Sequence, residues 1–236
     1  MLFLTITAFS CEKEDMKKYE PNCRTGNCVD VNIRGTLVVK PEGTGLRNIP
    51  VVVYFYKGSR VPLFPVERKV ASGKTNRNGE FDFKVTINTR SFEEHYLIVK
   101  IPEQKNYFTI HSEYGATFDM NHRIYRDYNA EDFKSINFEF YRKTNLTINL
   151  NRTQTDDIAR LNVLPEFVGA YVGSGMTNFQ LFEDELKTTN KLQWVTAADV
   201  YTYITWIKSL SNGERKTYSD SLICLPNVNN VFNINY

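Results

Sequence analysis

The residues best suited to chemistry lie close together in the segment from Gln104 to Asp132. They are His111, Glu113, Tyr114, Asp119, His122, Tyr125 and Tyr128. Two imidazoles and a carboxylate can bind a divalent cation, and exposed tyrosine rings can stack on the apolar face of a sugar. No ligand spacing such as His-x-x-x-His is present, so a polar loop held by its tyrosines is the competing interpretation. We therefore interpret the segment as a candidate ligand loop and predict no metal site.

The four cysteines suit an exported protein. Cys23 and Cys28 enclose a Gly-Asn turn and could form a small disulfide loop in an oxidising compartment. A zinc site is disfavoured, because a tetrahedral site needs four ligands and no second Cys/His pair at ligand spacing follows. Cys224 is left as an odd thiol without an assigned role.

Motifs for nucleophilic or phosphate chemistry are missing from the sequence. It holds no Gly-x-Ser-x-Gly, no glycine-rich phosphate loop and no recognisable pair of carboxylates. The net charge of +2 is far from the basic excess of a nucleic-acid-binding protein. We therefore predict no catalytic residue, no cofactor and no nucleic-acid partner.

The first fifteen residues indicate where the protein works. An apolar run from Leu2 to Phe9 ends at Ser10 and Cys11, as in a secretory signal, and it is too short to span a bilayer. The pair resembles the lipobox of bacterial lipoproteins, which implies that residues 1–10 are a signal peptide and that Cys11 carries the lipid anchor. Ala8 and Phe9 depart from the usual pattern, and no basic residue precedes the run, so the true start could lie upstream. A plain signal peptide and a buried N-terminal strand are the alternatives.

Residues 11–30 have the composition of a flexible tether, since they are polar and charged and lack an apolar period. Within them, Lys13, Glu14 and Asp15 resemble the short export signal of Bacteroidetes surface lipoproteins. That resemblance implies a location on the outer membrane, at the cell surface.

From residue 31 the sequence predicts strands. Ile33, Leu37 and Val39 alternate with polar residues, as in a strand with one wet face. The apolar run at 51–56 predicts a central strand covered on both faces, and residues 57–66 a loop or an edge. Further strands are expected at 96–101 and 136–141, and the alternation at 146–150 is expected to close the first domain. The stretch from 104 to 132 is expected to be an irregular insertion.

Three segments carry a family resemblance: Gly35-Thr36-Leu37, Ile49 to Val53, and Lys74 to Phe83 with its hairpin-like Asn78-Gly79 turn. Together they resemble the carboxypeptidase-regulatory, transthyretin-like β-sandwich, over about residues 31–150. The resemblance implies a spacer or binding scaffold. An enzyme branch of that fold hydrolyses hydroxyisourate and ends in Tyr-Arg-Gly-Ser, whereas this sequence ends Asn233-Ile234-Asn235-Tyr236.

Residues 151–236 form a second strand-rich block, which resembles the immunoglobulin-like second domain of small Bacteroidetes surface lipoproteins. The segment from Val200 to Ile207 is apolar or aromatic on both faces and should be a central strand covered on both sides. Asn212-Gly213 predicts a hairpin turn, and Val231 to Tyr236 a last strand. Short helices are possible only at 129–133 and 182–187.

One modification site is suggested in this block. Asp220-Ser221-Leu222 resembles the Bacteroidetes O-glycosylation triplet, which implies modification of Ser221. A coincidental strand sequence is the alternative.

These expectations describe an all-β protein with two sandwich domains behind a lipoprotein signal and tether. Its predicted function is that of a non-enzymatic binding or adhesion module for a glycan or a protein, held on the membrane by the lipid of Cys11. The alternative is a structural accessory subunit of an envelope assembly, in which an edge strand or the C-terminal strand pairs with a partner chain. An uncharacterised hydrolase is the least favoured interpretation.

Overall fold

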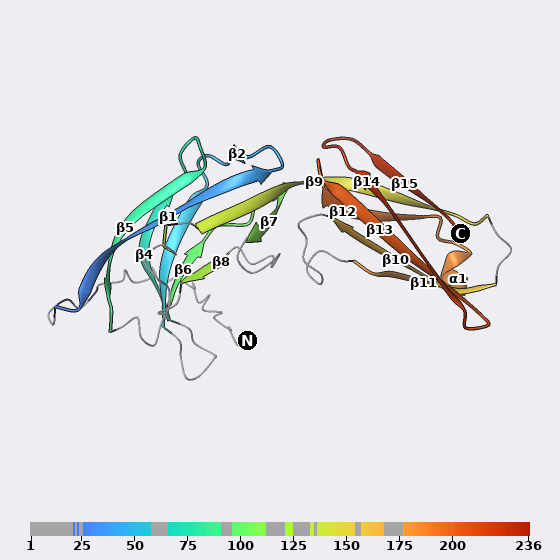
Figure 1. The fold of residues 1–236 in the computed structure, drawn as a ribbon, viewed down its shortest axis with the longest axis horizontal. Coiled ribbons are helices and arrows are strands. Elements are labelled where there is room, and N and C mark those ends of the chain that lie inside the picture. Colours follow the sequence, from blue (N-terminus) through green and yellow to red (C-terminus); the bar gives the residue numbers. More distant parts are fainter. Residues whose placement is uncertain are drawn as a thin grey trace, which may run out of the picture.

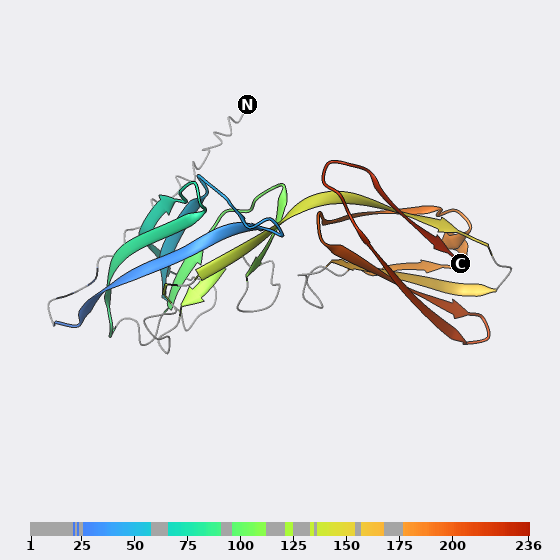
Figure 2. The same cartoon turned by 45° about the horizontal axis from the view of Figure 1, so that its top comes forward.

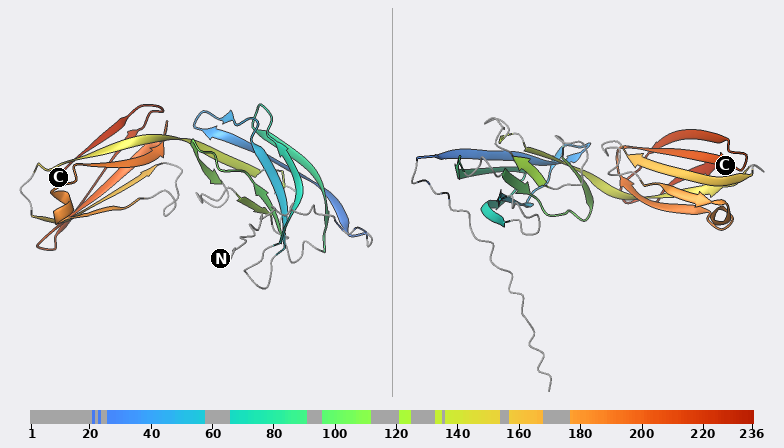
Figure 3. Two further views of the ribbon diagram at one scale, coloured as in Figure 1. Left: turned by 180° about the vertical axis from the view of Figure 1, so that it is seen from behind. Right: turned by 90° about the horizontal axis from the view of Figure 1, so that it is seen from below.

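The protein is built almost entirely from β-strands. They form two sandwich lobes that follow one another along the long axis of the molecule (Figures 1 and 3). The computed structural model describes residues 21, 23, 26–57, 66–90, 96–111, 121–124, 133–134, 136–153, 157–167 and 177–236. Among these residues, no helix is long and apolar enough to cross a membrane. The predicted all-β sandwich class is confirmed.

Two sheets make the first lobe. One has the order β4-β3-β6-β8, with β4 (Val66–Lys74), β3 (Pro50–Lys57), β6 (Tyr96–Lys100) and β8 (Asn121–Ile124). The other has the order β5-β1-β9-β7, with β5 (Glu80–Asn88), β1 (Cys28–Lys40), β9 (Ile136–Asn151) and β7 (Tyr107–His111). The short β2 (Thr44–Gly45) pairs with the end of β1. Strand β1 runs antiparallel to β5 and parallel to β9.

The core of this lobe lies where the alternation predicts it. Ile33, Leu37 and Val39 of β1 are buried, and so are the inward residues of β3. Strand β3 is central in its sheet, as expected, because it pairs with both β4 and β6. Its second face is only half-buried at Val52 and Tyr54, so the expectation of full cover on both sides is wrong. A two-layer sandwich covers only one face of each sheet.

The Asn78-Gly79 turn is formed, but it does not close a hairpin. It joins β4 to β5, which belong to different sheets. The Asn76 side-chain oxygen accepts hydrogen bonds from the backbone N–H groups of Asn78 (2.8 Å) and Glu80 (3.0 Å). Gly79 has a φ of 78°, which glycine adopts without strain. The turn therefore carries the chain from one sheet to the other.

In the first lobe, strands β1, β4, β7 and β8 differ from the sequence expectation. The strand β4 was not predicted, since its sequence is charged and lacks a clean alternation. Strands β7 and β8 lie in the segment expected to be an irregular insertion. Strand β1 begins at Cys28, inside the expected tether, because residues 28–30 already pair with β5.

The sixteen-residue strand β9 belongs to both lobes (Figure 2). Ile136, Phe138 and Phe140 enter the first core, whereas Leu146 and its alternating neighbours Ile148 and Leu150 enter the second. The residues expected to close the first domain thus pack in the second lobe. The change of core lies between residues 141 and 146, ahead of the boundary expected after residue 150.

The second lobe is also a two-layer sandwich. One layer is the second half of β9 flanked by β12 (Lys191–Ala197) and β15 (Asn230–Asn235). The other has the order β11-β10-β13-β14, with β11 (Phe179–Phe182), β10 (Ile158–Phe167), β13 (Tyr201–Leu210) and β14 (Arg215–Ile223). The single-turn helix α1 (Glu183–Leu186) falls inside one of the two expected helical segments, and the other lies largely outside the described residues.

Aromatic rings fill the junction between the lobes. Phe108 of β7 lies 5.0 Å from Phe167 of β10, measured between ring centroids, and Tyr141 of β9 packs on the same ring. Beside them, the Arg142 guanidinium forms ion pairs with Glu42 (2.6 Å) in the first lobe and Asp199 (3.8 Å) in the second. The lobes are therefore joined by packing and ion pairs as well as by the chain.

Replacing Gly79 by alanine should lower the thermal unfolding midpoint much more than the same change at Gly213. Both glycines have positive φ, so alanine adds about 1–2 kcal/mol of backbone strain at either position. A Cβ atom at Gly79 would also overlap the Leu37 carbonyl oxygen, whereas the space around Gly213 is open. Equal shifts of the two midpoints would contradict the tight packing of this turn.

Candidate functional site

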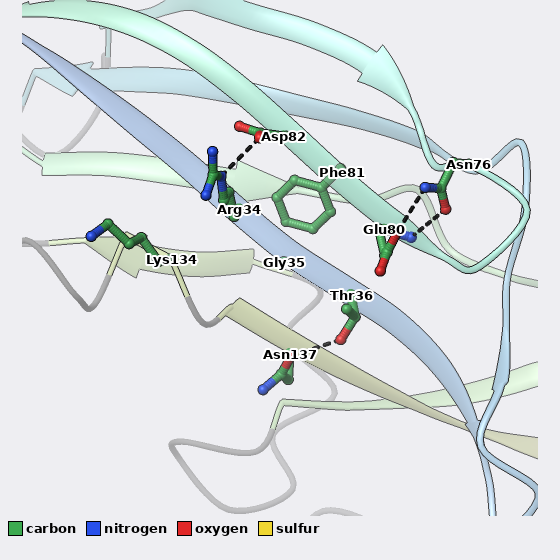
Figure 4. Close-up of a pocket in the computed structure, with 9 residues that line it drawn as sticks. All are labelled: Arg34, Gly35, Thr36, Asn76, Glu80, Phe81, Asp82, Lys134 and Asn137. Atoms are coloured by element: carbon green, nitrogen blue, oxygen red, sulfur yellow. Dashed lines mark hydrogen bonds and ion pairs between the residues drawn. The ribbon is translucent and has the colours of Figure 1, made fainter.

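A pocket of about 380 Å³ lies on the outer face of the β5-β1-β9 sheet of the first lobe (Figure 4). Polar and charged side chains from three strands and two loops surround it. Its lining residues are Arg34, Gly35, Thr36, Asn76, Glu80, Phe81, Asp82, Lys134 and Asn137. None of these residues stands out in the sequence as a candidate for chemistry.

The strand alternation places these groups. On β1 the inward Ile33 and Leu37 are buried in the core, so Arg34 and Thr36 point outward between them. Gly35 lies between these two residues, at a point where the neighbouring strands approach β1 closely. A Cβ atom there would overlap the Phe81 ring and the Ile136 carbonyl oxygen.

Hydrogen bonds and an ion pair hold the polar groups in place. The Arg34 Nε atom lies 2.8 Å from an oxygen of Asp82, across the β1–β5 pair. The Thr36 hydroxyl donates to the Asn137 side-chain oxygen at 2.7 Å, across the β1–β9 pair. The fixed side chains form a ready array of donors and acceptors for a polar ligand.

The two carboxylates of the pocket are not arranged for glycoside hydrolysis. Glu80 and Asp82 lie two residues apart on the same face of β5 rather than on opposite sides of a cleft. Each already has a partner: Glu80 accepts from the Asn76 amide at 2.8 Å, and Asp82 pairs with Arg34. The arrangement suits binding rather than acid–base catalysis.

The predicted ligand-loop residues are only partly described. His111 ends β7 and His122 lies in β8, and these strands belong to the two different sheets of the first lobe. Glu113, Tyr114, Asp119, Tyr125 and Tyr128 lie outside the described residues. Within the described part of the chain, no group of three His, Cys, Asp or Glu side chains could hold a metal ion.

The cysteines occupy two different environments. Cys23 and Cys28 form a disulfide at the start of β1, while Cys11 and the Lys13-Glu14-Asp15 segment lie outside the described residues. Cys224 is a buried free thiol next to β14. Burial raises its pKa, and a hydrogen bond with Thr202 partly offsets the rise, so the thiol is neutral and unreactive near pH 7.

An exposed aromatic pair lies on the outer face of the second lobe. Strand β13 is central between β10 and β14, as predicted, and Thr202 and Ile204 are buried on its inner face. Tyr201 and Tyr203, however, are 50% and 46% exposed, so the expected cover on the second face is wrong. Ser221, the candidate glycosylation residue, lies directly opposite Tyr203 on β14.

Comparison with known proteins finds remote likeness only. No protein-family model matches the chain, and no curated protein is similar to it. The TIE protein of Bacillus anthracis is 12% identical with a TM-score of 0.31, and the match covers 88% of this chain but 34% of that one.

Two pilins give comparable values. The shaft pilin SpaA of Lactobacillus rhamnosus GG is 12% identical with a TM-score of 0.33, over 88% of this chain and 97% of the pilin. The major pilin SpaD of Corynebacterium diphtheriae is 8% identical with a TM-score of 0.33, over 82% of this chain and 65% of the pilin. Likeness at this level does not determine a function.

Proposed function

We propose that the protein is a non-enzymatic binding or adhesion module, anchored by lipid to a bacterial outer membrane and exposed at the cell surface. The observation that supports this most is the outer-face pocket of the first lobe, where paired polar groups point to solvent. A ligand can bind these groups without any change to the core, since the core lies on the other face of the sheet. The ligand is a glycan or a protein.

The fold fits the role of a scaffold that displays such a surface. We propose that the first lobe, a sandwich of two sheets, is a transthyretin-like, carboxypeptidase-regulatory-like module. The second lobe is proposed to be immunoglobulin-like. In both lobes apolar residues fill the space between the sheets, and the outer faces stay available for contact.

The proposed location rests on the N-terminal sequence. The lipid of Cys11 holds the chain, Lys13 to Asp15 direct it to the cell surface, and the following polar residues lift the lobes off the membrane. The Cys23–Cys28 disulfide at the start of β1 is consistent with an oxidising compartment outside the cytoplasm.

A structural accessory role is the second candidate, favoured by the last strand. Among the described residues, β15 pairs with β9 alone, so its other edge has unpaired backbone groups. Asn149 and Asn151 of β9 donate side-chain hydrogen bonds to Asn233 (2.9 Å) and Asn235 (3.1 Å) of β15. A strand from a partner chain could extend this ladder.

The pocket can be tested with two double variants of the full chain carrying Cys11→Ala. Arg34→Ala/Asp82→Ala removes the ion pair of the pocket, and we expect it to weaken binding to glycan-array ligands at least tenfold. Asp30→Ala/Lys84→Ala is the matched control, because it removes an ion pair of similar length (3.0 Å) between the same two strands, outside the pocket. Both variants should keep the parent melting temperature, since exposed ion pairs add little stability. Equal binding by both variants contradicts the proposed site, and a parent that binds no array ligand rules out a glycan as its ligand.

The lipid anchor can be tested by replacing Cys11 with alanine in cells. Without the acylated thiol, the protein should move from the envelope fraction to the soluble fraction, because no other segment of the proposal holds it in the membrane. Fractionation and immunoblotting after a carbonate wash measure this. A variant that stays with the membrane rules out the anchor.

Surface exposure can be tested separately. Changing Lys13, Glu14 and Asp15 to alanine should protect the protein from protease added to intact cells, while it remains in the envelope fraction. Protection follows because the protein would no longer be exported to the outer face. Unchanged digestion would show that these residues are not the export signal.

A further inference from the structure

The exposed tyrosines belong to an uncharged strip on the outer face of the second lobe. The strip consists of four residue pairs that face outward from β13 and β14. They are Tyr201 with Ile223, Tyr203 with Ser221, Thr205 with Ser219, and Ile207 with Thr217. None of these eight side chains is charged, although 24% of the residues in the protein are charged.

The two rings form an accessible aromatic surface. Tyr201 and Tyr203 lie 6.3 Å apart between ring centroids, with an angle of 19° between their planes. About half of each side chain is exposed, and Ile223 beside Tyr201 is 47% exposed. Leaving this much apolar surface in water gives no benefit to folding. The pair therefore has the features of a contact surface.

The rest of the strip provides hydroxyl groups. Thr205 and Ser219 lie within hydrogen-bond distance (3.3 Å), and Ser221 and Thr217 lie on either side of Ser219 along β14. Hydroxyls can both donate and accept hydrogen bonds, so they match a ligand that also carries hydroxyls. The nearest outward charge on β10 is the carboxylate of Glu166, opposite Tyr203. It disfavours an anionic group beside the tyrosine rings by like-charge repulsion, whereas the cationic Arg160 and Arg215 lie opposite Ser209, beyond the far end of the strip.

We infer that this strip binds an uncharged glycan chain. The Tyr201 and Tyr203 rings stack against the C–H faces of neighbouring sugar units, because the π face of a ring is electron-rich and such C–H groups are electron-poor. The hydroxyls of Thr205, Ser219 and Ser221 bond to the sugar hydroxyls. The inference rests on the proposed binding function and adds a second surface, distinct from the pocket of the first lobe.

The test uses the full chain with Cys11→Ala and three named probes: an unsubstituted β-glucan, an unsubstituted mannan and a polyuronate. Affinity electrophoresis measures the dissociation constant for each. We expect at least one neutral polymer to be retarded and the polyuronate to run freely. Tyr201→Ala/Tyr203→Ala should weaken the neutral interaction at least tenfold. Tyr201→Phe/Tyr203→Phe keeps both rings and should stay within about threefold of the parent.

Three controls make the result specific to the strip. Val195→Ala removes an exposed apolar side chain of the other sheet and should bind as the parent does. Equal melting temperatures of all variants show that the lobe is folded, and an unmodified mass at Ser221 shows that the strip is free of the protein's own sugar.

The inference is overturned if the alanine pair binds as tightly as the parent, if no neutral polymer binds, or if the polyuronate binds best. It is also overturned if the strip of the unmodified protein mediates self-association, seen as a concentration-dependent mass that the alanine pair abolishes. The proposed function has a separate readout. An array ligand bound at the pocket is lost with Arg34→Ala/Asp82→Ala and kept with Tyr201→Ala/Tyr203→Ala, whereas a ligand bound at the strip shows the reverse.

Discussion

The architecture depends on a single strand that belongs to both lobes. The first half of β9 has β1 and β7 as neighbours, and the second half has β12 and β15. The even-numbered residues of β9 point into the first core up to Phe140 and into the second core from Leu146 onward. Arg142 is also even-numbered and lies between these two groups. There the guanidinium reaches Glu42 and Asp199 of the two lobes, while the preceding residue, Tyr141, packs in the aromatic cluster of the junction. A change in the angle between the lobes would disturb ladder hydrogen bonds on both sides of this point, so the two sandwiches are held as one extended body.

Because of this constraint, we expect ligand binding on the outer faces of the sheets. Each lobe is a two-layer sandwich whose apolar residues meet between the layers. Within the sheets, the residues that can meet a ligand are those that alternate with core residues, and loop residues such as Asn76 and Lys134 add to them. In the first lobe they are polar and paired around Gly35, and in the second they are tyrosines and hydroxyls. The same alternation that builds the cores thus also places the candidate surfaces.

Local patterns predicted much of the fold, and the exceptions have physical causes. The alternations in β1 and β5 reflect direct contact with a core on one face. Strand β4 escaped because it is an edge strand, rich in charge, and a bulge opposite Val53 and Tyr54 interrupts its alternation. Strand β9 looked like two strands because Arg142 and Lys143 interrupt its apolar period at the junction. The pocket could not be predicted, since it depends on nonlocal pairing that brings Thr36 to Asn137, 101 residues away.

For β13, whose outer face carries Tyr201 and Tyr203, two expectations from the sequence disagree. A two-layer sandwich covers one face of every strand, whereas the composition of residues 200–207 indicated a strand that is apolar on both faces. Both cannot hold unless a third layer is present, and among the described residues only the inner face meets a second layer. The aromatic residues left on the outer face are therefore not needed by the core. For β13, the apolar composition of both faces is for this reason a sequence signal of a contact surface, and it points to the exposed Tyr201 and Tyr203.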